Sequence, residues 1–442
     1  MTGVSRRRAL TAAAAGAVGG AWGTAACAGG PGQAGAPART LAGGVQFWTN
    51  PQYPFNEDIG GEIARDFAAR NPGVTVEGVP TPGSMVEKVT AAAAGGTPPD
   101  LATVDIYTPQ SLAASGATRA VEDYLKGSRA VKKTDLWPTH VSDLTYKGSL
   151  VAMPMGPDLR ILYISSDRYR ATGLDPDKPP RTWADLEQAV ARVFRASGDE
   201  VEHLGFDPVL GSGGVHRWLV PYWQLGGETL SADGEKVTIF NERGIQAMQW
   251  ILKLYNLQGG DARIRRFKAA APTEPAHFVQ GRVTHYYDAY TRRAQVFQKE
   301  APQLQFAFAT YPVPPNGRRA NYGGGWANVL AAGAKNPEAA WAFLEFLSED
   351  EQNLKLVDRY DQLPIRVATA KSERFTKKDP FRILAAEEIP YRKFVIAAPG
   401  GSETVPIQAA MVNSILQGQV SVSDGLKDGQ DQMQQVLDRW RR

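Results

Sequence analysis

The pattern of apolar and polar positions divides the folded part of the chain into alternating strands and helices. A β-prone run at 45–48 is followed by a helical pattern over 63–68 and a strand at 74–77. A second helix over 84–94 precedes a strand at 101–104. This alternation predicts an α/β fold whose strands form a parallel sheet with helices on its faces. In such sheets, ligands meet the loops beyond the carboxyl ends of the strands.

Further along, Tyr146-Lys147-Gly148 indicates a hairpin turn, followed by strands at 151–155 and 161–164. Thr182 and Asp185 have the spacing of a capping box, which predicts that a helix begins there. Later helices are expected at 242–256, 337–359 and 405–417.

The first 27 residues read as an export signal, because Arg6-Arg7-Arg8 precede a run of small apolar residues. The paired arginines resemble a twin-arginine signal, but Ala9 and Thr11 depart from its pattern and leave the export route open. The only cysteine, Cys27, ends a stretch that resembles a lipobox; the alternative is an incidental thiol. Residues 28–41, rich in Gly, Ala and Pro, are expected to form a flexible tether.

Charge excludes some classes of partner. The chain has 49 basic and 46 acidic residues, and cleavage before Cys27 removes three arginines and leaves a near-neutral protein. A neutral body lacks the basic surface that nucleic-acid binding requires. The five histidines have no metal-ligand spacing, so we expect no metal and no cofactor.

Several stretches, in this order, are similar to the sugar-type extracellular solute-binding proteins of ABC transporters, the family of maltose-binding protein. The most specific block runs from Tyr146 to Leu186, although Ser165 stands where the family usually has Asn. The other matching stretches are Phe67–Val76, Ala94–Asp100, Phe278–Arg282, Tyr311–Pro315, Gly323–Trp326 and Asn336–Trp341.

The resemblance implies a two-lobed periplasmic-binding-protein-like fold of type II, with discontinuous lobes joined by a hinge. Lobe one is expected at 42–156 and 283–326, and lobe two at 157–282 and 327–442. The implied protein is a lipid-anchored monomer on the extracellular face of the membrane, and not an enzyme. It would capture a carbohydrate between its lobes and deliver it to ABC permease subunits.

A sugar receptor needs flat aromatic rings for C–H faces and polar side chains for hydroxyls. The predicted ligand contacts are Trp48, Asn50, Asn56, Glu57, Asp105, Tyr107, Asp158, Arg160, Trp218, Trp223, Asp288, Tyr290, Gly324, Trp326 and Arg366. Among these, Trp326 is the strongest candidate, because the preceding glycines allow the backbone to approach a ligand.

Each candidate also has a structural interpretation. The loop with Trp48 can pack on its own lobe, Asp105 can cap a helix, and Asp158 can pair with Arg160. At least one of the tryptophans at 218 and 223, or the neighbouring Tyr222, is expected in the core, since their spacing does not place all three on one face. Arg366 can be a surface residue.

Other functions remain open. Glu57 and Asp288 could serve as the paired carboxylates of a secreted carbohydrate hydrolase. A structural or adhesive lipoprotein would need no ligand site. Within the binding class, peptide, polyamine, phosphate or iron are alternative ligands; iron is disfavoured because Tyr286-Tyr287 lacks clustered partners.

Overall fold

The computed structural model describes residues 41–50, 59–209, 214–270, 274–360 and 362–442. The leader, Cys27, nearly all of the tether, Asn56 and Glu57 lie outside these ranges, so the expectations about them stay predictions. Residues 41–442 form one compact unit.

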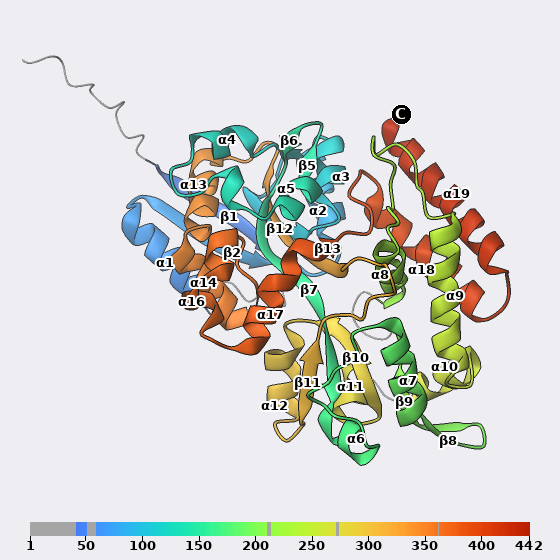
Figure 1. Cartoon of the computed structure of the whole chain (residues 1–442). Coiled ribbons are helices and arrows are strands. Elements are labelled where there is room, and N and C mark those ends of the chain that lie inside the picture. The colour runs from blue at the N-terminus through green and yellow to red at the C-terminus, as the bar shows by residue number, and fades with distance from the viewer. Residues whose placement is uncertain (1–40, 51–58, 210–213, 271–273, 361) are drawn as a thin grey trace, which may run out of the picture. The chain divides into compact units, whose positions relative to one another are not determined.

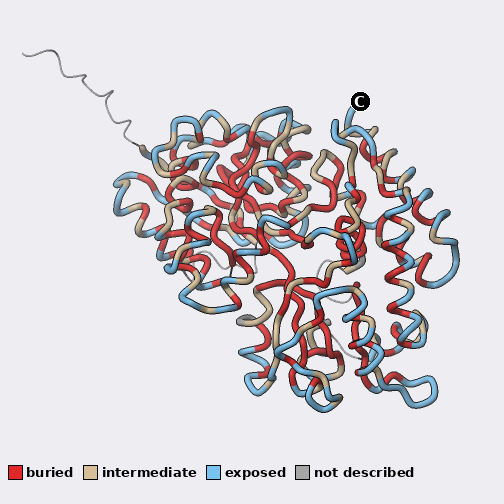
Figure 2. Tube along the Cα trace, in the orientation of Figure 1, coloured by how far each residue is buried: buried red, intermediate tan, exposed pale blue. Residues whose placement is uncertain are grey.

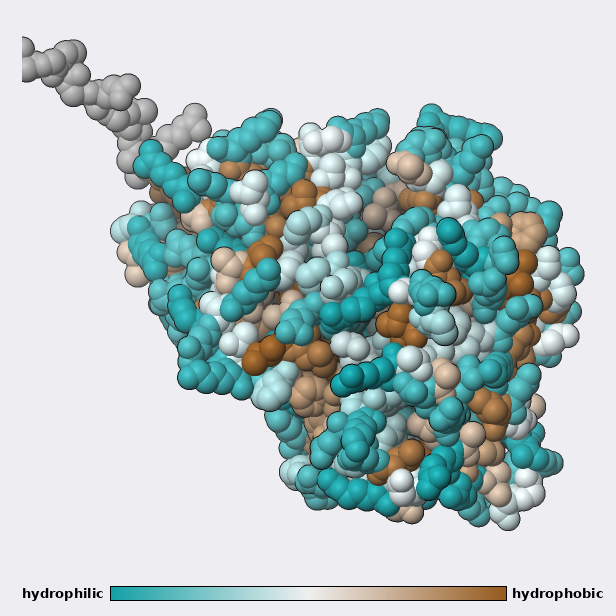
Figure 3. All heavy atoms as spheres, viewed as in Figure 1, coloured by the Kyte–Doolittle hydropathy of each residue, from teal (hydrophilic) through white to brown (hydrophobic). Residues whose placement is uncertain are grey.

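Of the described helices, none is both long enough and apolar enough to cross a membrane. The face in Figure 3 is largely hydrophilic with separate apolar patches.

The strands and helices alternate along the chain, as expected for an α/β protein (Figure 1). The strands are β1 Gly43–Thr49, β2 Val74–Pro80, β3 Leu101–Asp105, β4 Thr118–Arg119, β5 Thr145–Tyr146, β6 Ser149–Leu150, β7 Met153–Ser165, β8 Arg195–Ser197, β9 Glu200–Phe206, β10 Val283–Ala289, β11 Phe306–Ala309, β12 Asn321–Ala331 and β13 Arg392–Lys393. The helices are α1 Ile59–Arg70, α2 Met85–Ala94, α3 Pro109–Ala114, α4 Glu122–Gly127, α5 Pro138–Asp143, α6 Ser166–Ala171, α7 Trp183–Val193, α8 Leu219–Gln224, α9 Glu242–Asn256, α10 Asp261–Ala269, α11 Glu274–Val279, α12 Gln298–Glu300, α13 Pro337–Leu347, α14 Asp350–Tyr360, α15 Val367–Lys371, α16 Glu373–Thr376, α17 Pro380–Glu388, α18 Thr404–Leu416 and α19 Val422–Arg441.

The main sheet is mixed rather than parallel. Its strand order is β2-β1-β3-β12-β7-β10-β9-β8, with β11 paired to β7 and with β4 and β13 paired to β12. The expected parallel pairing holds for β1 with β2 and β3, whereas β12 runs antiparallel to both β3 and β7. The predicted arrangement is therefore correct for the first strands and wrong for the long strands that follow.

Strand β7 joins two parts of the sheet. Residues 153–159 pair with β12, while residues 160–165 pair with β10 and β11. The sequence had indicated two strands with Asp158 and Arg160 between them. Because hydrogen bonding passes from one partner strand to the next without a gap, the two predicted strands are one.

Two clusters of buried hydrophobic side chains flank this strand. The first cluster gathers residues of β1, β3, α1 and α13, and the second gathers residues of β9, β10, α8, α9 and α19. Buried segments in Figure 2 follow the strands and the inner faces of the helices. Side chains of β10 pack in the second cluster and those of α13 in the first. The lobe boundaries themselves stay a prediction.

Local signals explain several elements. Thr182 accepts a hydrogen bond from the Asp185 backbone N–H at 3.1 Å and its own N–H donates to Asp185 at 2.9 Å, so the predicted capping box is confirmed. The helix expected at 337–359 is instead α13 and α14, because the chain leaves the helix at Ser348. The Ser348 hydroxyl donates to the Leu344 carbonyl at 2.8 Å and helps to end α13.

Candidate functional site

Partly exposed side chains gather where β3, β7 and β12 lie side by side. These strands are mostly buried, but Asp105, Asp158, Gly325 and Trp326, together with Tyr107 just beyond β3, retain solvent access. The register brings them together, since Trp326 is opposite Asp105 on β3 and Gly324 is opposite Asp158 on β7. We call these residues, with Gly324, the acid–aromatic cluster.

Gly325 accounts for the placement of Trp326. It has a φ of +128°, a backbone conformation that side-chain-bearing residues rarely adopt. A Cβ there would lie 2.6 Å from the Gly156 carbonyl oxygen. The pairing of β12 with β7 then shifts register between Trp326 and Ala327, and such a bulge redirects the side chain next to it.

Asp158 has one occupied and one unoccupied carboxylate oxygen. Its Oδ2 accepts from Arg160 at 2.5 Å, whereas its Oδ1 is buried and has no protein partner among the described residues. The Asp158 side chain is 26% exposed and that of Arg160 only 6%. The predicted pairing of these residues is therefore confirmed, and a hydrogen-bond acceptor is left over for a ligand.

Two tyrosines hold the next part of the cluster. The hydroxyls of Tyr107 and Tyr322 lie 2.6 Å apart, and the Tyr107 ring stacks on Phe394 with centroids 4.4 Å apart. The guanidinium of Arg160 lies over the Tyr322 ring at 5.0 Å. A Cβ on Gly324 would be 3.4 Å from the Tyr107 hydroxyl and 3.7 Å from Asp158 Oδ2, so the glycine keeps the space between them open.

The carboxyl of Asp105 is electrostatically unusual. Burial, with the nearby Asp158 charge acting in the same direction, raises its pKa from 3.8 to about 7, while a hydrogen bond from the Tyr107 backbone N–H and the Arg160 charge oppose the shift. Asp105 Oδ1 accepts the Tyr107 hydrogen bond at 3.0 Å, and the Asp105 carbonyl accepts a separate hydrogen bond from the Thr108 hydroxyl. Burial therefore favours the protonated form of Asp105 next to the Asp158 carboxylate.

Asp288 lies in a different environment, in which protein side chains already occupy its carboxylate. The side chain is fully buried. Oδ1 accepts from Arg217 at 3.0 Å, and Oδ2 accepts from Arg292 at 3.2 Å and from the Tyr286 hydroxyl. A carboxylate with this many donors is a structural anchor and also does not fit the catalytic carboxylate of the hydrolase alternative.

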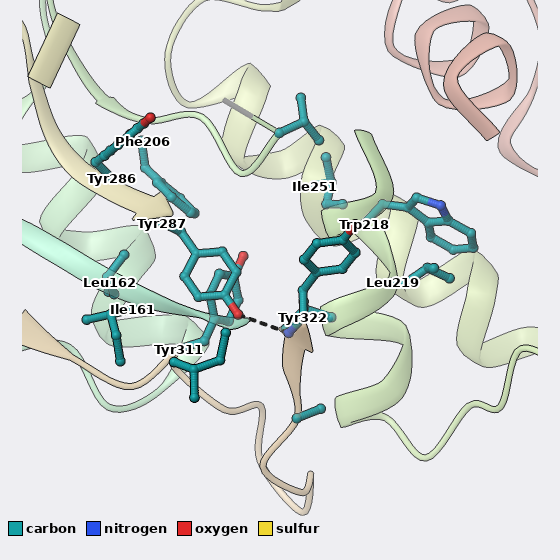
Figure 4. Packing of buried hydrophobic residues seen from close by; sticks show 14 of the residues in the cluster. Ile161, Leu162, Phe206, Trp218, Leu219, Ile251, Tyr286, Tyr287, Tyr311 and Tyr322 are labelled. Atoms are coloured by element: carbon teal, nitrogen blue, oxygen red, sulfur yellow. Dashed lines mark hydrogen bonds between the residues drawn. The ribbon is translucent and has the colours of Figure 1, made fainter. Parts of the chain in front are cut away.

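Trp218, Trp223 and Tyr290 are core residues. Both tryptophans are fully buried; Trp218 stacks on Tyr222 with ring centroids 5.8 Å apart, and Figure 4 shows it beside Leu219. Tyr290 is buried and stacks on Phe381 with centroids 4.9 Å apart. None of the three offers a free aromatic face, so the expected stacking platform is replaced by core packing.

The remaining predicted contacts have other surroundings. Trp48 packs partly buried against the first hydrophobic cluster, and Asn50 lines a small cavity together with Met155. Arg366 donates to the Ala130 carbonyl, its Nε lies 3.7 Å from Asp350, and its side chain is only 16% exposed, so it is not the surface residue that the structural interpretation expected.

Sequence reasoning missed Tyr322, Phe394 and Arg217. Tyr322 directly precedes the glycine run, which is the one signal that could have identified it. Phe394 is far from Tyr107 in the sequence, and the fold brings their rings together. Within the described part of the chain, no group of three His, Cys, Asp or Glu side chains could hold a metal.

A partly exposed arrangement of carboxylates and aromatic rings on a mixed α/β sheet is typical of a protein that binds a small polar ligand. Residues 62–381 match the family described as bacterial extracellular solute-binding proteins. The chain belongs to this family. The family and the structural neighbours are binding proteins, not enzymes.

Individual relatives are distant in sequence but similar in fold. A binding protein of Brucella abortus is 24% identical over 85% of this chain and 89% of its own. The structure of CpMnBP1 with mannotriose bound has a TM-score of 0.75 at 21% identity, covering 88% of this chain and 99% of that one. A cyclic alpha-maltosyl-1,6-maltose binding protein from Arthrobacter globiformis has a TM-score of 0.75 at 20% identity, covering 90% and 100%. These similarities show the two-domain binding-protein fold.

Proposed function

We propose that this protein captures an oligosaccharide at the acid–aromatic cluster and delivers it to the membrane subunits of an ABC importer. The observation that supports this most directly is that the register of β3, β7 and β12 brings the partly exposed Asp105 and Asp158 carboxylates together with Trp326. Carboxylates accept hydrogen bonds from sugar hydroxyls, and aromatic rings pack on sugar C–H faces. Two structural neighbours are described with mannotriose or a cyclic maltose derivative, which agrees with this ligand class.

The ligand contacts in this proposal are Asp105, Tyr107, Asp158, Gly324 and Trp326. Arg160 is a positioning residue, because it is almost fully buried and fixes one oxygen of Asp158. Its backbone is held in turn by Asn321, whose side chain accepts from the Arg160 N–H at 2.9 Å and donates to its carbonyl at 2.8 Å. Asn56 and Glu57 remain proposed contacts from the sequence.

In this proposal the two hydrophobic clusters are the cores of two lobes, which close on the sugar about β7 and β12. Closure requires that the ligand bind the closed form more tightly than the open form. A shift from mostly open to mostly closed needs about 5.5 kcal/mol of differential affinity. Two or three hydrogen bonds to charged groups, at about 1.5–3 kcal/mol each, supply this.

Export and a lipid anchor at Cys27 complete the proposal. The anchor would keep the binding protein near its permease through the 28–41 tether. The Cys27→Ser variant tests it: we expect the wild-type protein to partition into detergent and to carry a mass increment on its N-terminal peptide, and the variant to do neither. A wild-type protein without that increment would contradict the anchor but leave sugar binding untouched.

Calorimetric titration with maltose- and mannose-type oligosaccharides tests the binding function. At least one sugar should bind, and Trp326→Ala should weaken it at least tenfold, about 1.4 kcal/mol or more, because a stacking face is lost. The matched control is Trp440→Ala, which removes a tryptophan that is bonded to Glu403 at the chain's far end. Equal losses in both variants, or no binding of any sugar, would contradict the proposal.

A further inference from the structure

A second cavity lies apart from the acid–aromatic cluster. Its volume is about 580 Å³, which is within the range of small-ligand sites. Side chains from α5, from the 228–234 segment, from 318–319 and from the β13 region at 390–397 form its walls. We call it the Arg392 cavity.

The lining of this cavity is rich in cations. Arg318, Arg319, Arg392 and Lys393 face two carboxylates, Asp143 and Glu228. Glu228 is occupied by two of these cations, with Arg318 Nη2 at 2.5 Å and Lys393 Nζ at 2.5 Å. Arg392 pairs with Asp143, and Arg319 pairs with Glu388, which is buried and stands outside the lining.

Several donors in this wall have no acceptor. The side chain of Arg392 has no exposed surface, yet its Nε and Nη1 have no protein partner among the described residues. The same is true of Arg319 Nε and of the Thr139 hydroxyl. Buried donors without an acceptor are rare in folded proteins, and bound water or a bound ligand is a common explanation.

The neighbours of Arg392 do not supply the missing acceptor. Both ring nitrogens of the adjacent His140 are without a partner among the described residues, so His140 accepts no hydrogen bond from Arg392. Burial lowers the pKa of His140 well below its usual value, and the Arg392 charge acts in the same direction. Burial raises the pKa of Asp143, although Arg392 opposes this, which weakens the one carboxylate that faces the guanidinium. The Phe394 ring covers another side of Arg392, at 5.6 Å.

We propose that the Arg392 cavity is a second ligand site, which binds the phosphate or carboxylate group of a small dissolved anion. The unpartnered guanidinium nitrogens of Arg392 and the Thr139 hydroxyl donate to its oxygens, since a guanidinium matches the geometry of such groups. Tyr391, 39% exposed and stacked under Arg319 at 4.3 Å, provides an aromatic surface for the rest of the molecule.

This site is separate from the acid–aromatic cluster but adjacent to it. Phe394 packs on Tyr107 on one side and on Arg392 on the other. The test below uses no sugar, so its result is independent of whether the protein binds carbohydrate.

The experiment is calorimetric titration of the full chain with inorganic phosphate and, in a second arm, with succinate. We expect at least one to bind with an affinity in the millimolar range or tighter. Arg392→Gln should weaken that binding at least about tenfold, and Thr139→Val, which keeps the side chain's shape, about threefold. Glu228→Gln should tighten it, because Arg318 and Lys393 lose their carboxylate.

The matched control is Arg170→Gln, which removes one positive charge from an exposed helix. It should leave anion affinity unchanged. If Arg392→Gln fails to fold, the Thr139→Val and Glu228→Gln titrations decide. Absence of binding by both anions, or equal binding by wild type, Thr139→Val and Glu228→Gln, would overturn the proposal.

Discussion

Asp158 and Asp288 are both strand carboxylates that pair with arginine, yet their surroundings differ. Asp158 has one arginine, one unoccupied oxygen and a quarter of its side chain exposed. Asp288 has two arginines and a tyrosine hydroxyl, and no exposed surface. The number of donors already bound to each carboxylate, rather than its position in a strand, separates a candidate ligand contact from a structural anchor.

This difference follows from the cost of burying charge. A buried ion pair is stable only when hydrogen bonds satisfy its remaining polar atoms, and removal of one partner leaves an uncompensated charge. Asp288 meets that condition and Asp158 does not. The Asp158 cluster can therefore gain hydrogen bonds from a ligand, while the Asp288 cluster has no acceptor to spare.

Asp288, Arg217, Arg292 and Tyr286 together form what we call the saturated cluster. The largest effect should come from breaking it. Asp288→Asn removes the charge that compensates Arg217, whose side chain is 1% exposed. We expect the free energy of unfolding to fall by about 3–5 kcal/mol. Urea denaturation followed by tryptophan fluorescence measures this.

Asp167→Asn is the control, because it removes an equally charged partner of an exposed arginine. It should change the free energy of unfolding by no more than about 0.5 kcal/mol. Comparable losses in the two variants would show that Asp288 is not an anchor.

Two neighbouring glycines in the acid–aromatic cluster give the next effect. Gly325→Ala forces a Cβ into a left-handed backbone position and within 2.6 Å of the Gly156 carbonyl, so we expect a loss of about 1–3 kcal/mol of stability. Gly324→Ala should be tolerated in stability, since its nearest contact is 3.4 Å, but it fills the space between Tyr107 and Asp158.

Thermal unfolding and sugar titration of both variants separate these roles. Gly324→Ala should unfold like wild type and bind sugar more weakly. A Gly324→Ala variant with unchanged sugar affinity would remove that space from the proposed site.

The sequence predicted the fold class and many element positions, because periodicity and capping are local. The helix over 242–256 and the Thr182 capping box are observed as expected. The merging of two strands into β7 was not predictable from local pattern, since it depends on partner strands more than 120 residues later in the chain, as in the Arg160–Asn321 bond with its separation of 161 residues.

For the candidate site, residue type and strand position identified Asp105, Asp158 and Trp326, but they equally selected Asp288, Trp218 and Trp223. Burial distinguishes the two groups. Whether an aromatic ring after a strand faces solvent or a core depends on helices packed over it, such as α9, which contacts the Gly214–Trp218 turn. That packing is a property of the fold and leaves no signature near the tryptophan itself.

Asp105 should make stability depend on pH in the acid–aromatic cluster. Its native pKa of about 7 lies above its ordinary value of 3.8, so the native state retains the proton longer than the unfolded chain. The stabilisation from Asp105 is present in full below pH 3.8 and is lost as pH rises through about 7. Relative to Asp105→Asn, the free energy of unfolding of the wild type should fall by on the order of 1–2 kcal/mol between these pH values. This figure is reduced for the partial exposure of the side chain.

Denaturation of both proteins at a series of pH values measures this. Asp185→Asn provides a control in which the pH dependence has the opposite sign. Hydrogen bonds from Thr182 lower the pKa of Asp185, so the Asp185 carboxylate adds to the free energy of unfolding as pH rises. A pH profile unchanged by Asp105→Asn would place the Asp105 carboxyl in solvent.

The smallest effect should come from Tyr286→Phe in the saturated cluster. The variant removes one donor to Asp288 Oδ2, but Arg292 Nε still donates to that oxygen at 3.2 Å and Arg217 still donates to Oδ1. Because no atom of Asp288 is left without a donor, we expect a loss of about 1.5 kcal/mol, the lower value for a hydrogen bond to a charged group. Urea denaturation beside Asp288→Asn measures the ratio of the two losses. If Tyr286→Phe lowered the free energy of unfolding as much as Asp288→Asn, the arginines alone would not hold the Asp288 carboxylate. Asp158 and Asp288 would then differ in exposure but not in the number of hydrogen-bond donors that each needs.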